Sequence, residues 1–186
     1  MQTPCTTLYW AIYAISAQKF WSCREKVLTL PDKTTITNYK QTDFIMHSDP
    51  KECLYCTNNQ TLRDLMIEIC PLTVSRLFLF KEQTYRGRCL VAYNGHVNDL
   101  NELADDERNA FMADVARATR AMQQAFNPEK INYGAYSDKL SHLHFHLAPK
   151  YVDGPDYGGV FQMNPGKVYL TDAEYQELVN KIKENL

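Results

Sequence analysis

The chain has 186 residues and a formal net charge of −2, with 20 lysines and arginines against 22 aspartates and glutamates. This length suits one domain with a sizeable core. The 45% of hydrophobic and 23% of charged residues exclude a wholly disordered or collagen-like chain. Extended nucleic-acid binding and polybasic membrane binding are also disfavoured, because both require a large cationic excess.

The first 45 residues differ in texture from the rest of the chain. They hold both tryptophans and a weakly patterned, threonine-rich stretch, whereas regular patterning begins at Met46. We predict an N-terminal extension over 1–45, either an extra helix and arm or upstream sequence from a mis-assigned start, and a main domain over 46–186. No apolar run approaches the roughly 20 residues of a membrane-spanning helix. The apolar stretch 8–17 lacks the flanks of a secretory signal, so we expect a cytoplasmic protein without a membrane partner.

The elements after Met46 begin with a predicted helix that starts at Thr61 and is stopped by Pro71. Its apolar residues share one helical face, and they are Leu62, Leu65, Met66 and Ile69. Two short apolar runs, 76–81 and 88–93, follow around a turn that contains Gly87. These runs predict two neighbouring antiparallel strands.

A long helix is predicted over 105–126, because acidic residues fill its first turn and Asn127-Pro128 ends its apolar periodicity. The segments 130–135 and 142–148 predict a second pair of strands. A capping box from Thr171 to Glu174 then opens a terminal helix. The order of strand pair, long helix, strand pair and short helix predicts an α+β fold with an antiparallel sheet.

Three of the five histidines lie in the segment Ser-His-Leu-His-Phe-His-Leu-Ala-Pro at 141–149. Successive strand side chains point to opposite faces, so His142, His144 and His146 share one face and the intervening apolar residues enter the core. Three interpretations are open: a solvated edge strand, a three-histidine metal site, or a division of tasks. In the third, the middle imidazole attacks a phosphorus while its neighbours orient it and contact the phosphate. Same-face neighbours lie roughly 6.5 Å apart, so three imidazoles of one straight strand fit a single ion poorly.

This His-φ-His-φ-His-φ-φ signature, in which φ is apolar, resembles that of the histidine triad (HIT) family of nucleotide hydrolases and transferases. The preceding Ile-Asn-Tyr-Gly at 131–134 supports the resemblance, which extends from about residue 53 to residue 150. It implies a HIT-like catalytic domain in which His144 is the nucleophile and His146 contacts the transferred phosphate. His142 would be the supporting triad residue, and Asn132 would bond near the α-phosphate.

Two parts of the family pattern differ in this chain. Several members carry Gln or Ser near the leaving group, whereas residues 138–141 are Asp-Lys-Leu-Ser, so Ser141 and Lys139 become the candidate contacts. The aspartate that often holds the ribose hydroxyls is missing from 78–87, and we expect Glu82 or Gln83 in its place.

Cys53 and Cys56 form a Cys-x-x-Cys pair that fits a zinc site, a redox pair or two free thiols. The following Thr-Asn-Asn-Gln is loop-like, which disfavours a thioredoxin-type setting. His96 and His142 could complete a closed tetrahedral site of two thiolates and two imidazoles. The resemblance implies the same four ligands, since many bacterial triad proteins bind zinc through corresponding positions. Such an ion would be structural.

We therefore predict a hydrolase or nucleotidyl transferase that acts at the α-phosphorus of a nucleoside phosphate derivative through a nucleotidyl-histidine intermediate. The substrate would be a dinucleoside polyphosphate or a nucleoside phosphoramidate. One alternative is a nucleotide-binding or adaptor protein with little turnover, and another is a hydrolase with three histidines around a catalytic ion. The expected partner is a small-molecule nucleotide, and the resemblance implies a homodimer.

Overall fold

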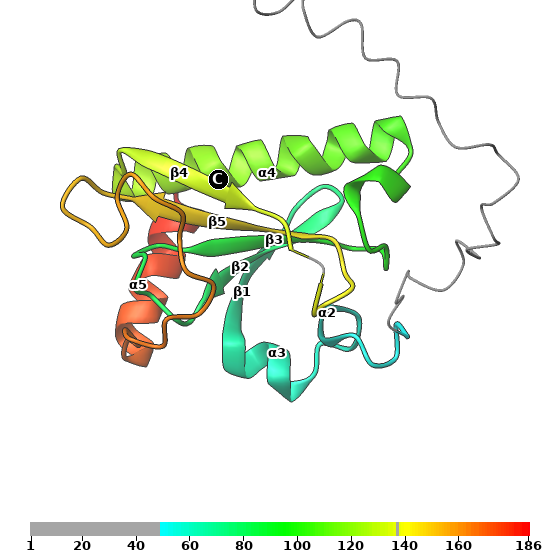
Figure 1. Cartoon of the computed structure of the whole chain (residues 1–186), viewed down its shortest axis with the longest axis horizontal. Helices are drawn as coiled ribbons and strands as arrows, with labels where there is room; N and C mark the ends of the chain where they lie inside the picture. The colour runs from blue at the N-terminus through cyan, green and yellow to red at the C-terminus, as the bar shows by residue number, and fades with distance from the viewer. Residues whose placement is uncertain (1–48, 137) are drawn as a thin grey trace, which may run out of the picture. The chain divides into compact units, whose positions relative to one another are not determined.

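The structure is a computed structural model that describes residues 49–136 and 138–186 (Figure 1). The predicted extension over 1–45 and the predicted domain start at Met46 lie outside these residues. One antiparallel sheet of five strands, in the order β1-β2-β3-β5-β4, forms the centre of the described part. Its strands are β1 (Met66–Pro71), β2 (Ser75–Phe80), β3 (Cys89–Tyr93), β4 (Lys130–Gly134) and β5 (His144–Lys150). The helical elements are α2 (Leu54–Thr57), α3 (Gln60–Leu65), the 3₁₀ turn η2 (Leu100–Glu102), α4 (Asp105–Phe126) and α5 (Asp172–Lys183). The predicted α+β class is confirmed.

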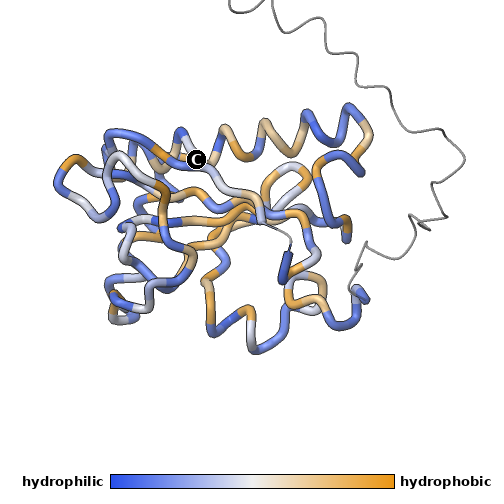
Figure 2. Tube along the Cα trace, viewed as in Figure 1, coloured by the Kyte–Doolittle hydropathy of each residue, from blue (hydrophilic) through white to orange (hydrophobic). Residues whose placement is uncertain are grey.

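The sheet separates two apolar layers. Leu77, Val91 and Phe145 stand opposite one another on β2, β3 and β5 and pack with α4 and α5. Phe78 and Leu90 point to the other face, where α2 and α3 cover part of the sheet. Figures 1 and 2 show α4 along one side of the sheet, α2 and α3 on the other, and mostly apolar strands between them. None of the described helices is long and apolar enough to cross a membrane.

The helix predicted after Thr61 is wrong beyond Leu65. Residues 66–71 form β1, an edge strand paired with β2, and its register shifts between Glu68 and Cys70. A bulge of this kind breaks the two-residue alternation of a strand. Met66 and Ile69 are therefore both buried three positions apart, which is the spacing that imitated a helical face.

The long helix, the terminal capping box and the turn at Gly87 match their predictions. The helix α4 covers 105–126, and Asn127 ends it in the left-handed conformation. The Thr171 side chain accepts from the Glu174 backbone N–H at the start of α5. Gly87 has a φ of +82°, and a Cβ there would lie 2.5 Å from the Phe126 ring, so the turn requires glycine.

Residues 151–171 join β5 to α5 without regular secondary structure, and we call their central part, 156–170, the strap. Its main chain is tied to the turn between β2 and β3. The N–H groups of Lys167 and Val168 donate to Glu82 at 3.1 and 3.3 Å, and the Gln83 N–H donates to the Val168 carbonyl at 2.8 Å. The Gln162 N–H donates to the Tyr85 hydroxyl at 2.7 Å.

Candidate active site and metal centre

The three histidines of the signature lie in a row on the α2 side of the sheet. His144 and His146 belong to β5, and His142 lies two residues before the strand, which begins at His144 and not at His142 as predicted. The delay follows from local bonding, because the His142 N–H donates to the Leu140 carbonyl at 2.7 Å instead of entering the ladder. All three imidazoles are at most 5% exposed, while Leu143 and Leu147 enter the opposite core. The predicted division of faces is confirmed, and this burial rules out a solvated edge strand.

The four predicted metal ligands converge beside the first histidine. The donor atoms of Cys53, Cys56, His96 and His142 lie within 4.8 Å of one another. The Sγ atoms of Cys53 and Cys56 are 3.4 and 3.6 Å from His142 Nδ1, and Cys56 Sγ is 3.3 Å from His96 Nδ1. With Zn–S and Zn–N bonds of about 2.3 and 2.0 Å, a tetrahedral ion holds sulfur and nitrogen ligands about 3.5 Å apart. The cluster therefore fits zinc.

The orientation of His142 is also that of a metal ligand. Its Nε2–H donates to the Tyr93 carbonyl at 2.9 Å, which leaves the Nδ1 lone pair facing the two thiols. A carbonyl behind a ligating imidazole fixes the tautomer in this way. Burial lowers the pKa of His142 to about 4, so the ring is neutral at pH 7, as ligation requires.

The middle histidine has the opposite assignment of ring nitrogens. His144 Nδ1 donates to the His142 carbonyl at 2.6 Å, so Nε2 carries the lone pair. The Tyr55 ring packs against it at 5.2 Å between centroids. Burial holds the pKa of His144 below its usual value, and the ring is neutral near pH 7. A neutral imidazole with a free Nε2 is a nucleophile.

The Nδ1 atom of the third histidine accepts a hydrogen bond, whereas the Nδ1 atom of His144 donates one. The Arg88 Nη2 lies 3.0 Å from His146 Nδ1. A guanidinium can only donate, so Nδ1 accepts and the imidazole proton is on Nε2. Burial, followed by the charge of Arg88, lowers the pKa of His146 to about 2. The ring is therefore neutral and lies among aromatic side chains, and the nearby positive charge belongs to Arg88.

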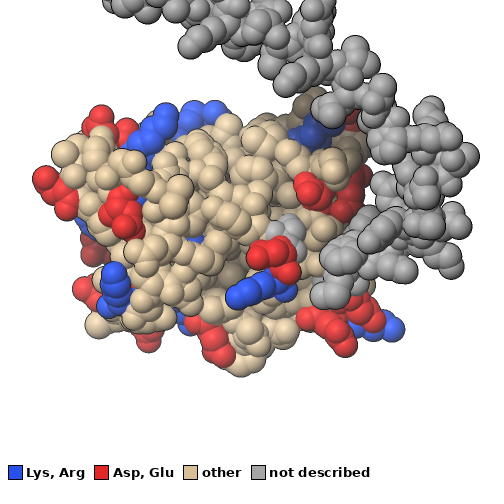
Figure 3. Space-filling model, in the orientation of Figure 1, with Lys and Arg blue, Asp and Glu red and all other residues tan. Residues whose placement is uncertain are grey.

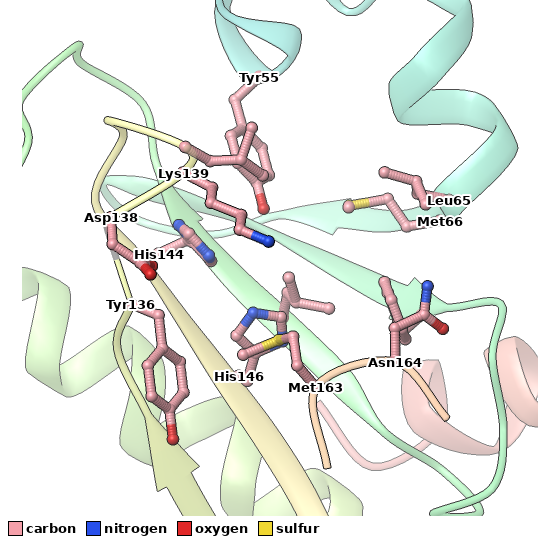
Figure 4. Close-up of a pocket in the computed structure, with 13 residues that line it drawn as sticks. Tyr55, Leu65, Met66, Tyr136, Asp138, Lys139, His144, His146, Met163 and Asn164 are labelled. Carbon is pink, nitrogen blue, oxygen red and sulfur yellow. The ribbon is translucent and has the colours of Figure 1, made fainter. Parts of the chain in front are cut away.

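A cavity of about 200 Å³ opens above His144 and His146 (Figure 4). The Tyr55 hydroxyl and the Lys139 ammonium point into it, and Asp138 lies at the same rim. The remaining lining is mostly apolar and comes from α3, the sheet, the loop before β5 and the strap: Leu65, Met66, Phe80, Leu90, Tyr136, Leu140, Met163 and Asn164. Figure 3 shows charged side chains scattered over this face of the molecule, without a large patch of one sign.

The predicted substrate contacts are only partly brought together. Lys139 lines the main cavity, and with Ser141 it also lines an adjoining hollow beside His142. Asn132 shares the histidine face, but it pairs with Ala148 and lines a separate hollow on β4, so its role near the phosphate remains a prediction.

Glu82 and Gln83 do not line the main cavity. Both are buried, and Glu82 accepts bonds from the strap. The Gln83 side chain donates to the Phe80 carbonyl and accepts from the Gly87 N–H, so both residues hold the turn and the strap rather than a ribose.

Comparison with known proteins agrees with this geometry. The family model of the HIT domain matches residues 72–153, which include His96 and the three histidines of the signature. Over these residues the chain carries a HIT domain. The Protein hit of Bacillus subtilis (strain 168) is 25% identical to it over 108 residues, or 55% of this chain and 71% of that protein.

Solved histidine triad structures confirm the fold. A histidine triad protein from Sinorhizobium meliloti superposes with a TM-score of 0.64 at 19% identity, over 69% of this chain and 95% of that chain. A Zn-bound histidine triad family protein from Mycobacterium smegmatis gives a TM-score of 0.54 at 18% identity, over 73% and 96% of the two chains.

Sequence reasoning missed two residues that contact the histidine row, Tyr55 and Arg88. Tyr55 lies between the two cysteines of the Cys-x-x-Cys pair, at the start of α2, and its ring packs against His144. Its position between two predicted metal ligands is the one signal in the sequence that places it near the site. Arg88 opens an apolar run and reads as the polar end of a strand. Only the register of β3 with β5, in which Leu90 faces His146, brings its guanidinium behind the imidazole.

Proposed function

We propose that this protein is a hydrolase or nucleotidyl transferase that acts at the α-phosphorus of a nucleoside phosphate derivative. The observation that carries the proposal is the bond from His144 Nδ1 to the His142 carbonyl, which leaves a nucleophilic Nε2 at the cavity. The match of residues 72–153 to the HIT domain supports a nucleotide as the ligand. The apolar wall of Leu65, Met66 and Phe80 offers a nucleoside a dry surface beside the reacting centre.

The reaction proceeds in two displacements. The Nε2 lone pair of His144 forms an N–P bond as the bond from phosphorus to the leaving group breaks, and the electron pair departs with that group, which takes up a proton. Water then attacks the phosphorus and loses a proton to the solvent, which balances the proton that the leaving group took up from the solvent. The N–P bond breaks, the Nε2 lone pair of His144 is restored, and a nucleoside monophosphate is released. The Nε2–H of His146 donates to a phosphate oxygen during both steps, and such preorganised donors are typically worth 10²–10³ in rate.

On the leaving-group side, Lys139 and the Tyr55 hydroxyl are the polar groups that enter the cavity. The lining contains a single lysine and a single aspartate. A polyphosphate leaving group would gain little from this nearly neutral rim. We therefore expect a nucleoside phosphoramidate to be cleaved in preference to a dinucleoside polyphosphate.

Zinc at Cys53, Cys56, His96 and His142 would be structural, because all four positions of the tetrahedron are taken by protein ligands. The Zn-bound relative from Mycobacterium smegmatis supports zinc as the metal. These four residues join the loop around α2 to the segment that precedes β5. The His142 carbonyl that holds His144 is therefore fixed by the same cluster.

The test is an acid quench of the purified protein during turnover of adenosine phosphoramidate and diadenosine tetraphosphate, followed by intact mass measurement. The wild type should show an adduct of one nucleoside monophosphoryl group. His144→Ala should show no adduct and lose at least 10³-fold in rate, whereas Gln176→Ala on the exposed side of α5 should behave as wild type. Wild-type turnover by His144→Ala would contradict the proposal. Binding without turnover or adduct in the wild type would instead indicate a nucleotide-binding adaptor.

A further inference from the structure

Arg88 is completely buried behind the histidine row, although it is the side chain type that most strongly requires water or a counter-charge. Its Nη1 donates to the Met163 carbonyl at 2.6 Å, and its Nη2 contacts His146 Nδ1 at 3.0 Å. The guanidinium lies over the rings of Phe80 and Phe161, with centroid distances of 4.5 and 5.0 Å. Two hydrogen bonds and two aromatic rings therefore fix the position of the guanidinium.

This guanidinium has no ion pair within 4.0 Å in the part of the chain that the structure describes. Its Nε is buried without a hydrogen-bond partner among the described residues. The carboxylate of Glu82 interacts with the guanidinium electrostatically and raises its pKa, but does not form an ion pair with it. Burying a charge without a close counter-charge is energetically unfavourable. Anchoring the strap does not require that cost, because Tyr85 and Glu82 already hold neighbouring strap positions.

The contact with His146 explains why a charged side chain is buried at this position. Because a guanidinium cannot accept a hydrogen bond and keeps its protons at neutral pH, it holds Nδ1 as an acceptor and prevents protonation there. The remaining proton is on Nε2, on the cavity side of the ring. A charged donor behind the imidazole also polarises the ring and strengthens the outward Nε2–H as a donor.

We propose that Arg88 is a positioning residue: it fixes His146 as the Nε2–H tautomer and supplies, through that ring, the positive polarisation that a phosphate oxygen meets in the cavity. The catalytic consequence rests on the proposed function, whereas the tautomer is a property of the resting protein. His146 then acts as a permanent donor and does not exchange a proton during the reaction.

The primary test is the tautomer of His146 in the full-length protein without substrate, read from long-range ¹H–¹⁵N correlations of its imidazole. The wild type should show the proton on Nε2. Arg88→Met, which keeps length but removes every donor, should give a mixture of tautomers or the Nδ1–H form. Replacing a buried charge by an apolar side chain is often neutral for folding, so this variant is expected to fold. A wild-type His146 with its proton on Nδ1 would overturn the proposal whatever the variants do.

The matched control is Tyr85→Phe, which removes a strap anchor but does not touch His146. It should keep the Nε2–H tautomer. An equal tautomer change in Tyr85→Phe and Arg88→Met would mean that packing of the strap, and not the guanidinium, sets the ring, and the proposal would fail. Arg88→Lys keeps a charged donor and should restore the Nε2–H tautomer at least in part.

The kinetic arm separates this proposal from the proposed function. If the protein turns over nucleotides, Arg88→Met should lower kcat by about 10²-fold with little change in KM, because the donor acts mainly in the transition state. A wild-type kcat in Arg88→Met would overturn the positioning role. If no nucleotide is turned over, the proposed function fails, and the tautomer alone decides: a switch in Arg88→Met but not in Tyr85→Phe supports the positioning role, and no switch overturns it.

Discussion

At the two ends of the histidine row, the position of the imidazole proton is set by opposite kinds of hydrogen bond. At the first end, the His142 ring donates to a backbone carbonyl and turns its lone pair toward two thiols. At the far end, the His146 ring accepts from Arg88 and turns its proton toward the cavity. His144 lies between them, held by the main-chain carbonyl of His142.

The difference shows that neighbouring imidazoles in one row can be given different chemistry by the atom behind each ring. A carbonyl leaves the outer nitrogen basic, and a guanidinium leaves it a donor. The strand alone supplies only the common direction of the side chains. What lies behind each ring comes from the end of β3 at Tyr93, from the main chain of the histidine row itself, and from the turn before β3 at Arg88.

The largest expected effect is the loss of the metal ion at the His142 end of the row. Cys53→Ser should lower bound zinc from one equivalent to less than half an equivalent, because a hydroxyl is a poor replacement for a thiolate ligand. The loss of a structural ion should cost at least about 3 kcal/mol, or roughly 6–12 °C in Tm for a chain of this size. Metal analysis and thermal unfolding measure both. Arg88→Met should keep its metal, and equal metal loss in the two variants would show that the ends are not independent.

A second prediction concerns the pH dependence of stability at the far end. His146 faces the charged and titratable groups Arg88, His144 and Tyr136. Its folded pKa is about 2, and an imidazole in the unfolded chain has a pKa near 6.5. Since the unfolded state binds the proton first, this ring stabilises the fold above pH 6.5 and loses that contribution as the pH falls below it.

Urea unfolding at pH 7.5 and 4.5 tests this sign. The wild type should lose about 3 kcal/mol more than His146→Asn over that interval, because the carboxylates common to both proteins cancel. Identical losses in the two proteins would mean that the ring is already protonated in the folded state or is solvated.

The smallest expected effect is a loss of stability far from the site, which serves as a reference for the other two predictions. Thr171→Ala removes the capping box of α5, away from both ends of the row, and should cost about 1 kcal/mol. Zinc content and turnover should match the wild type at temperatures well below Tm. A change in turnover would show that stability losses of this size reach the site, and the effects of the other variants would then need correction for it.

The predictability of each part follows from how local its cause is. The bounds of α4 were predicted because acidic residues, periodicity and Asn127-Pro128 all act within the segment. The strand β1 was misread because its bulge arises from pairing with β2, which no local pattern reveals. The imidazole faces followed from strand alternation, but the proton positions did not. They depend on Tyr93 and Arg88, which reach the rings only through the register of β3 with β5.

Most hydrogen bonds between the strap and the rest of the protein come from its main chain, at Gln162, Met163, Lys167 and Val168. Two of its side chains add to them: Asp156 accepts from the Tyr85 hydroxyl, and Phe161 is buried against the Tyr85 ring. Main-chain anchors do not depend on which side chains the segment carries. The Asn164 side chain, which lines the cavity between those anchors, can therefore be replaced without loosening the wall. A substitution at Asn164 therefore changes the lining of the cavity while the histidine row and the cluster of Cys53, Cys56, His96 and His142 keep their geometry.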